Sequence, residues 1–133
     1  MKNFSIITIL ALVLGSTSFA AEQETQSTTK YIEYSQLGDP AEVLTVKEQR
    51  SRALKSGEIR VKVLATPINP SNLLEISGRY GVDPVLPARP GSEGVGRVVE
   101  VSAEVEHLTV GQLVLLASGS AWAEELIAPA TGF

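Results

Sequence analysis

Few side chains in this sequence of 133 residues could act as nucleophiles, strong bases or metal ligands. There is no cysteine, and the single histidine is His107. The absence of cysteine excludes disulfides, thiolate zinc sites, iron–sulfur clusters and cysteine nucleophiles. One histidine cannot form a histidine-rich metal site, and it leaves a Ser-His-Asp triad only one candidate base. His107 lies in an expected turn beside Glu106, so we expect it to be exposed and assign it no role.

The polar groups that could bind a ligand gather in short motifs. They are Asn69-Pro70-Ser71-Asn72 with Gly78-Arg79-Tyr80 after it, then Gly91-Ser92-Glu93-Gly94, and finally Gly119-Ser120-Ala121-Trp122. The glycines Gly91, Gly94 and Gly96 do not form a G-x-G-x-x-G fingerprint, and they precede an expected strand rather than open a helix. The sequence therefore predicts no dinucleotide-phosphate site at these glycines.

Short strands are expected to position these motifs, because apolar residues mostly alternate with polar ones from residue 31 onward. The expected strands cover residues 31–34, 43–46, 58–65, 94–105, 113–116 and 121–127. One helix is expected to begin near Pro70 and to end at Gly78. Six short strands, a short helix and turns rich in glycine and proline predict a mainly β fold that is compact and barrel-like.

The N-terminus has the features of a cleaved secretory signal peptide over residues 1–20. Lys2 supplies a positive start, residues 4–14 form an apolar run, and Ser18 and Ala20 are the small residues that signal peptidase reads. The run has about 11 residues where a membrane-spanning helix needs about 20, so we expect no stable membrane insertion. An uncleaved N-terminal anchor is the alternative. Cleavage after Ala20 would leave residues 21–30 as a flexible leader and export the protein to the periplasm or the medium.

Charge composition argues against nucleic acid as a partner. Eleven lysines and arginines stand against fifteen acidic residues, which gives a net charge of −4. Because counterion release needs a concentrated basic surface, and the sequence shows no basic cluster, we expect no nucleic-acid binding. Hydrophobic residues make up 44% of the chain, which favours one folded domain over intrinsic disorder.

The motifs, taken in order, resemble the N-terminal half of the medium-chain dehydrogenase/reductase superfamily. They run from GEIRVKVLATPINPSNLLEISGRYG through LPARPGSEGVGRVVEVSAEVEHLTVGQLVLL to GSAWAEELIAPA. That half is the GroES-like, or alcohol dehydrogenase N-terminal, domain of the superfamily. The sequence is most similar to the zinc-free branch of quinone oxidoreductases and 2-enoyl thioester reductases. The resemblance covers residues 31–133 and implies a GroES-like, partly open β-barrel with one or two short helices.

The resemblance also implies that no catalytic zinc is bound. Zinc-dependent members carry a cysteine where this sequence has Asn69, and a histidine where it has Ser92. Asn and Ser are weak neutral ligands, whereas catalytic zinc takes three strong ones and an open position. Glu93 remains, and we expect it to be a buried carboxylate held in the barrel by hydrogen bonds. No metal site is therefore expected.

Tyr80 is the candidate catalytic residue. In the enoyl thioester reductases that this sequence resembles, a tyrosine at this spacing donates a proton or a hydrogen bond to the enolate oxygen. The alternative is a loop aromatic that packs under the proline-rich segment. Asn69, Asn72 and Trp122 are expected to line the substrate cleft, although an Asn before Pro is also a common turn residue. A lone Trp is also often simply a core or cleft-wall residue.

The resemblance implies NADPH as the cofactor of the full-length family, held by a Rossmann domain of about 150 residues or more. We expect no such domain and no cofactor site in this chain, and so no activity from the chain alone. One hypothesis is a truncated oxidoreductase of the NADPH-dependent, zinc-free type, which self-associates or takes its Rossmann-type half from another chain. The other is an exported, non-catalytic GroES-like module that binds a small apolar ligand or a protein partner.

Overall fold

The computed structural model describes residues 27–117 and 119–133. The expected signal peptide of residues 1–20, and most of the expected leader, lie outside the described residues. The elements, in chain order, are β1 (Thr28–Glu33), α1 (Pro40–Val43), β2 (Thr45–Arg50), β3 (Glu58–Ala65), α2 (Pro70–Ile76), β4 (Gly94–Val101), β5 (Leu113–Leu116), β6 (Glu125–Pro129) and the 3-10 helix η1 (Ala130–Gly132). No helix in this part of the chain has the length and apolar character needed to cross a membrane.

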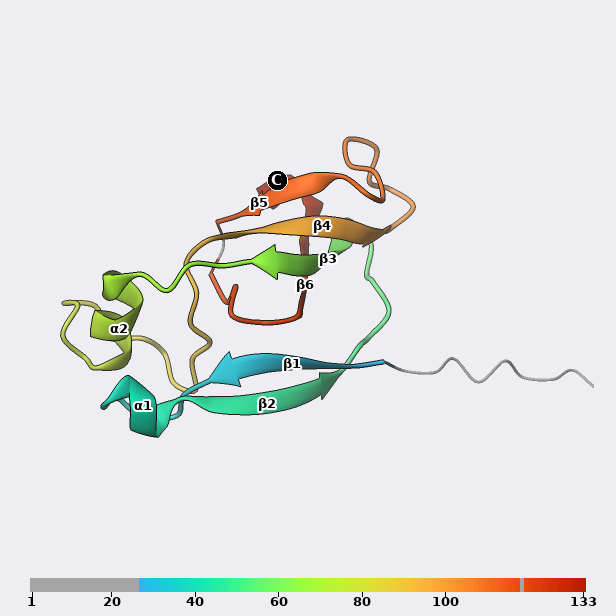
Figure 1. Cartoon of the computed structure of the whole chain (residues 1–133). Coiled ribbons are helices and arrows are strands. Elements are labelled where there is room, and N and C mark those ends of the chain that lie inside the picture. Colours follow the sequence, from blue (N-terminus) through green and yellow to red (C-terminus); the bar gives the residue numbers. More distant parts are fainter. Residues whose placement is uncertain (1–26, 118) are drawn as a thin grey trace, which may run out of the picture.

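The strands form two antiparallel layers (Figure 1). β1 and β2 make a two-stranded ribbon, and the other four strands make a sheet in the order β5-β4-β3-β6. Both short helices lie at one end of the molecule. The expected mainly β, partly open barrel with one or two short helices is confirmed.

The main core lies on the inner face of the four-stranded sheet. Ile59 and Val61 of β3 are fully buried there, beside Val98 of β4 and Leu116 of β5. Gly96 of β4 precedes Val98 by two residues, and a side chain at this position would clash with Val61 Cγ1 and lie 2.9 Å from the Lys62 carbonyl oxygen. The absence of a side chain at residue 96 therefore lets β3 and β4 approach each other.

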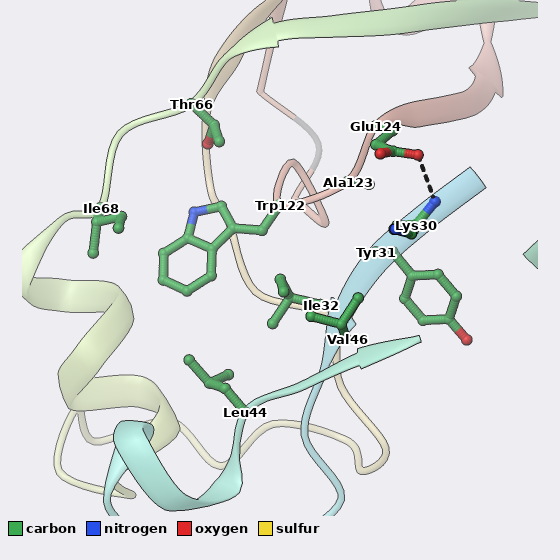
Figure 2. Close-up of a pocket in the computed structure, with 10 residues that line it drawn as sticks. All are labelled: Lys30, Tyr31, Ile32, Leu44, Val46, Thr66, Ile68, Trp122, Ala123 and Glu124. Atoms are coloured by element: carbon green, nitrogen blue, oxygen red, sulfur yellow. Dashed lines mark hydrogen bonds between the residues drawn. The ribbon is translucent and has the colours of Figure 1, made fainter. Parts of the chain in front are cut away.

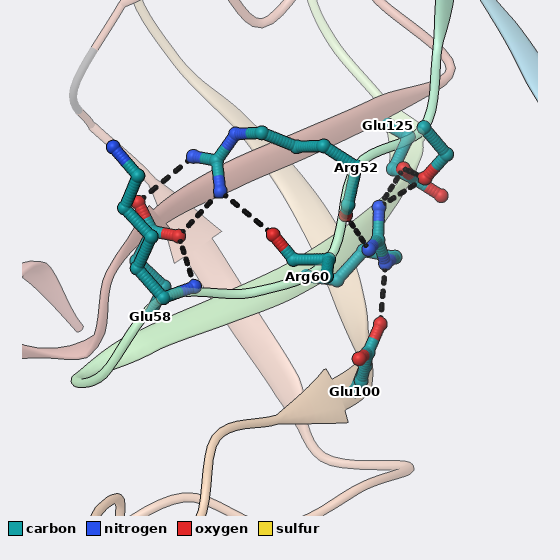
Figure 3. A network of polar contacts seen from close by, with 8 residues as sticks. Arg52, Glu58, Arg60, Glu100 and Glu125 are labelled. Carbon is teal, nitrogen blue, oxygen red and sulfur yellow. Dashed lines mark hydrogen bonds and ion pairs between the residues drawn. The ribbon is translucent and has the colours of Figure 1, made fainter.

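A buried arginine joins three strands of the sheet. Arg60 of β3 is only 9% exposed, and its guanidinium bonds Glu100 of β4 and Glu125 of β6, each at 2.6 Å (Figure 3). Beside it, Arg52 makes a bidentate pair with Glu58 at 2.7 and 2.8 Å. Those bonds from Arg52, and then the backbone N–H of Lys55, lower the pKa of Glu58 to about 2.

Several boundaries differ from the expected ones, while β3, β5 and α2 confirm theirs. Residues 43–46 were expected to be a strand, but α1 ends at Val43 and β2 runs from Thr45 to Arg50. The reason is local, because Asp39 accepts a hydrogen bond from the N–H of Ala41 at 2.9 Å and Pro40 begins the helix. β1 also begins earlier, at Thr28.

The last two strands also differ from the expectation. β4 ends at Val101 rather than at residue 105, and β6 begins at Glu125 rather than at residue 121. Residues 121 and 122 pair instead with the proline-rich segment, since Ala121 N–H donates to the Gly91 carbonyl and Trp122 N–H to that of Pro90. Residues 121 and 122 therefore run between the ribbon and the sheet. There the Trp122 carbonyl accepts a hydrogen bond from the N–H of Ile32 at 2.9 Å.

Candidate functional site

The first part of the site is the N-terminal turn of α2. Asn69 precedes the helix, Pro70 occupies its first turn, and the backbone N–H of Asn69 donates to Oδ1 of Asn72 at 3.1 Å. Asn72 is only 2% exposed. Its side chain therefore positions Asn69 from below and does not itself face a ligand.

The second part is the loop that leads into β4. Asn69 Nδ2 donates to Oε1 of Glu93 at 2.6 Å, and Asn72 Nδ2 donates to Oγ of Ser92 at 3.3 Å. The two loops are further joined by Thr66, whose hydroxyl donates to the Glu93 carbonyl at 2.8 Å. The structure thus joins two of the expected site residues, Asn69 and Asn72, in one hydrogen-bonded corner.

Glu93 is exposed, so the expectation of a buried carboxylate was wrong. An ionised carboxylate is costly to remove from water, and here it needs no burial because the Asn69 amide reaches it at the surface. The next residue, Gly94, is packed closely against β3, since a Cβ at this position would lie 2.7 Å from the carbonyl oxygen of Ala65.

The donor set of this corner is a poor fit for zinc. Besides Glu93, the hydrogen-bonded side chains of the corner are those of Asn69, Asn72 and Ser92, and all three are neutral. Across residues 27–117 and 119–133, no three His, Cys, Asp or Glu side chains gather closely enough to hold a metal ion. The absence of a catalytic zinc stays a prediction, to be tested by metal analysis.

The third part is an apolar pocket with Trp122 as one wall (Figure 2). Its volume is about 480 Å³, and Ile32, Leu44, Val46 and Ile68 are among the residues that line it. Val46 is 63% exposed and Ile68 69% exposed, so much of this apolar lining faces solvent. Such a surface can hold the apolar part of a small ligand.

Two interactions fix the indole of Trp122 in this wall. Its Nε1–H donates to the Pro67 carbonyl at 3.1 Å, two residues before Asn69. On the other side Gly91 has φ of +102°, and a Cβ there would lie 2.6 Å from Trp122 Cδ1. Glycine is needed at position 91 both for the backbone conformation and for this close approach. Trp122 therefore adjoins the Asn69 corner.

Tyr80 is not brought to this pocket. It lies in the loop after α2, its side chain is 53% exposed, and it is not among the pocket's lining residues. Within the described part of the chain, its hydroxyl makes no side-chain hydrogen bond that would orient it. His107 is exposed as expected, and its Nε2 lies 3.0 Å from the carbonyl oxygen of Ala130.

The sequence analysis missed most residues that form the pocket. Ile32 and Val46 come from the ribbon and Leu44 from the junction of α1 with β2, whereas Ile68 and Trp122 come from loops farther along the chain. Alternation placed Ile32 and Val46 in strands, but it could not tell that both face the same pocket. The register that pairs Ile32 with Val46 supplies that information.

A model of the alcohol dehydrogenase GroES-like domain family matches residues 55–130. The mitochondrial enoyl-[acyl-carrier-protein] reductase of Rattus norvegicus is 38% identical over 114 residues, which is 84% of this chain and 30% of the rat protein. The Homo sapiens protein of the same name is 38% identical over 115 residues, 85% of this chain and 31% of that protein. The chain thus spans about a third of the length of these curated relatives.

Two solved structures are also similar. One, described as an NADPH:quinone reductase from Bacillus thuringiensis, has a TM-score of 0.70 and 38% identity, covering 78% of this chain and 32% of that one. The other is the complex of Etr1p with NADP and crotonyl-CoA, with a TM-score of 0.69 and 29% identity, covering 77% of this chain and 32% of that one.

Proposed function

Because the chain belongs to the alcohol dehydrogenase GroES-like domain family, we propose that it supplies the substrate side of a zinc-free, NADPH-dependent reductase of enoyl thioesters or quinones. The observation that carries the proposal is the apolar pocket beside the Asn69–Glu93 corner. The relatives described as enoyl reductases and as an NADPH:quinone reductase support the reaction class. Substrate and activity are proposals, since the chain spans about a third of those relatives.

The pocket is the proposed site for the apolar part of the substrate. An acyl chain or a quinone ring would pack against Trp122, Ile32 and Val46, and burying those groups would provide most of the binding free energy. The indole is already held by Pro67 and Gly91, so little rotamer freedom is lost when a ligand binds.

Polar groups at the edge of the pocket are proposed to orient the reacting end. Asn69 presents an amide whose position is fixed by Asn72 below it and by Glu93 beside it. Tyr80 is proposed as the proton donor, because a phenol can stabilise or protonate an oxygen on which negative charge develops. Its exposed loop would have to bring the hydroxyl to the substrate when the complex forms.

The described residues do not fit the nucleotide part of NADPH, which would supply the hydride. Gly91, Gly94 and Gly96 lead into strand β4 and not into a helix. At the start of α2, Pro70 has no N–H, and the N–H of Asn69 is already bonded to Asn72. We propose that the cofactor is held by a Rossmann-type domain of another chain or by residues outside those described.

The test uses Trp122 as a reporter, since it is the single tryptophan in the sequence. Titration with the N-acetylcysteamine thioester of trans-2-hexenoic acid should change its fluorescence saturably. Val46→Asp should weaken binding about tenfold, because it puts a carboxylate into the apolar pocket. Val110→Asp is the matched control, since Val46 and Val110 are both 63% exposed and only Val46 lines the pocket.

The same preparation should not oxidise NADPH with this thioester, and it should not bind NADPH. Turnover by the chain alone that Tyr80→Phe abolishes would show that the cofactor site is present after all. A fluorescence change that does not saturate, or equal weakening by both aspartate variants, would contradict the assignment of the pocket as the substrate site.

We also propose that the protein is exported to the periplasm or the medium. The support is the sequence of residues 1–20 with its Ser18 and Ala20 pair. Export would separate the domain from the cytoplasmic pool of NADPH.

A further inference from the structure

A second pocket lies where the end of β2 and the residues after it meet β6. It has a volume of about 270 Å³, and its lining includes Arg50, Ser51, Arg52, Arg89, Ser120 and Glu125. Figure 2 shows the Tyr31 ring pointing away from Trp122. The guanidinium of Arg89, a residue that lines the second pocket, stacks on that ring. We call this site the arginine pocket.

The charges that line the arginine pocket do not cancel. Arg52 is neutralised by Glu58, and Glu125 is neutralised by Arg60. Arg50 and Arg89 form no ion pair with any carboxylate in the part of the chain that the structure describes. Two arginines without a carboxylate partner therefore line one pocket, although the whole protein is acidic.

Arg89 is held in place before any ligand arrives. Its guanidinium carbon lies 3.5 Å from the centroid of the Tyr31 ring, and the side chain is half-buried. This stacking restricts the plane of the group while its N–H edges stay free to donate. An arginine ordered in this way loses less conformational entropy on binding an anion than a fully solvated one.

The wall of the pocket is also rigid. Ser51 N–H donates to the Ser27 carbonyl at 2.8 Å, and the Ser51 hydroxyl donates to Glu125 at 3.1 Å. Arg60 donates to the same hydroxyl oxygen from within the sheet (Figure 3). The segment that carries Arg50 and Arg52 is therefore fixed to β6.

We propose that the arginine pocket binds a phosphate group. Phosphate carries close to two negative charges at neutral pH and has several acceptor oxygens, which match two unpaired guanidinium forks. A carboxylate carries one negative charge and is matched by a single guanidinium group. A volume of about 270 Å³ admits a phosphate with a small organic group and is too small for a dinucleotide.

The test follows the arginine side chains of the whole chain by NMR. With ionic strength held constant by NaCl, inorganic phosphate should shift the Nε–Hε signals of Arg50 and Arg89 saturably. Arg89→Gln and Arg50→Gln should each weaken phosphate binding at least about tenfold. Arg97→Gln is the matched control, because Arg97 lies exposed on β4, bonds the Gly111 carbonyl and does not line the pocket.

Two further probes define the ligand. Glycerol 3-phosphate should bind at least as tightly as inorganic phosphate if the site takes esterified phosphate, and binding of inorganic phosphate alone would assign it to the free ion. Both results support the proposal, provided that acetate binds at least tenfold more weakly. Acetate binding as tight as phosphate, equal shifts of every arginine, or equal weakening by Arg97→Gln would overturn it.

Discussion

The sharpest test of the site's architecture is the replacement of Asn72 by alanine. This side chain is 2% exposed and makes two hydrogen bonds, accepting from Asn69 N–H at 3.1 Å and donating to Ser92 Oγ at 3.3 Å. A hydrogen bond of this kind contributes about 1 kcal/mol, and a buried group left without its partner adds a further penalty. We expect the free energy of unfolding to fall by about 2 to 3 kcal/mol.

That loss is large enough to measure by thermal unfolding. For a domain of about 100 residues, 1 kcal/mol corresponds to roughly 5 °C, so the melting temperature should fall by about 10 to 15 °C. Circular dichroism would follow unfolding, with Ser92→Ala as the control. Ser92→Ala removes only the longer of the two bonds but leaves the buried Asn72 amide without that acceptor, so its cost should be about 1 kcal/mol, less than that of Asn72→Ala.

The result that would refute this reasoning is a small effect of Asn72→Ala, below about 0.5 kcal/mol. It would mean that water replaces both bonds and that the turn before α2 holds Asn69 unaided. A Ser92→Ala variant as unstable as Asn72→Ala would also refute it, because the stability would then reside in the loop and not in the helix start.

Three further predictions concern pH, metal and the N-terminus. Because Arg52 lowers the pKa of Glu58 to about 2 in the folded protein, this pair stabilises the fold fully above about pH 4.5 and loses its effect as pH falls toward 2. Acid titration of stability should therefore show a shallower loss between pH 4.5 and 2 in Glu58→Gln, and an unchanged slope would argue against the pair. Purified protein should contain far less than one zinc per chain, and chelator should leave its melting temperature unchanged; stoichiometric zinc whose removal unfolds the protein would contradict the reading of Asn69 and Ser92. Mass spectrometry of protein expressed in a secreting host should find a chain that starts at Ala21, whereas a chain that keeps Met1 in the cytosol would rule out the signal peptide.

Much of the fold could be predicted from local patterns. The alternation of Ile59, Val61 and Val63 with charged residues located β3 to the residue, and the Asn-Pro start with its later glycine located α2. The boundaries that differ lie where two local signals favour different structures for the same residues. The turn signal of Asp39-Pro40 began a helix that extended into the expected strand, and pairing with Gly91 kept residues 121 and 122 out of β6.

For the candidate site, the sequence predicted some of the residues that belong to it but not the position that each takes in the folded chain. Asn69, Asn72 and Trp122 could be singled out from their motifs, yet their roles differ in the folded chain: Asn72 is buried beneath Asn69, and Trp122 is a pocket wall. The exposure of Glu93 is a property of the packed structure that its motif does not encode.

By itself, the sequence determined the class of fold, the lack of thiolate chemistry and the family resemblance, because these follow from composition, periodicity and ordered motifs. Only the tertiary structure decided which side chains meet. The register of β1 with β2 places Ile32 directly opposite Val46, so that both side chains line the apolar pocket beside Trp122. The paired residues lie 12 to 22 positions apart in the chain, and a shift of the register by one residue would turn Val46 to the opposite face of the ribbon.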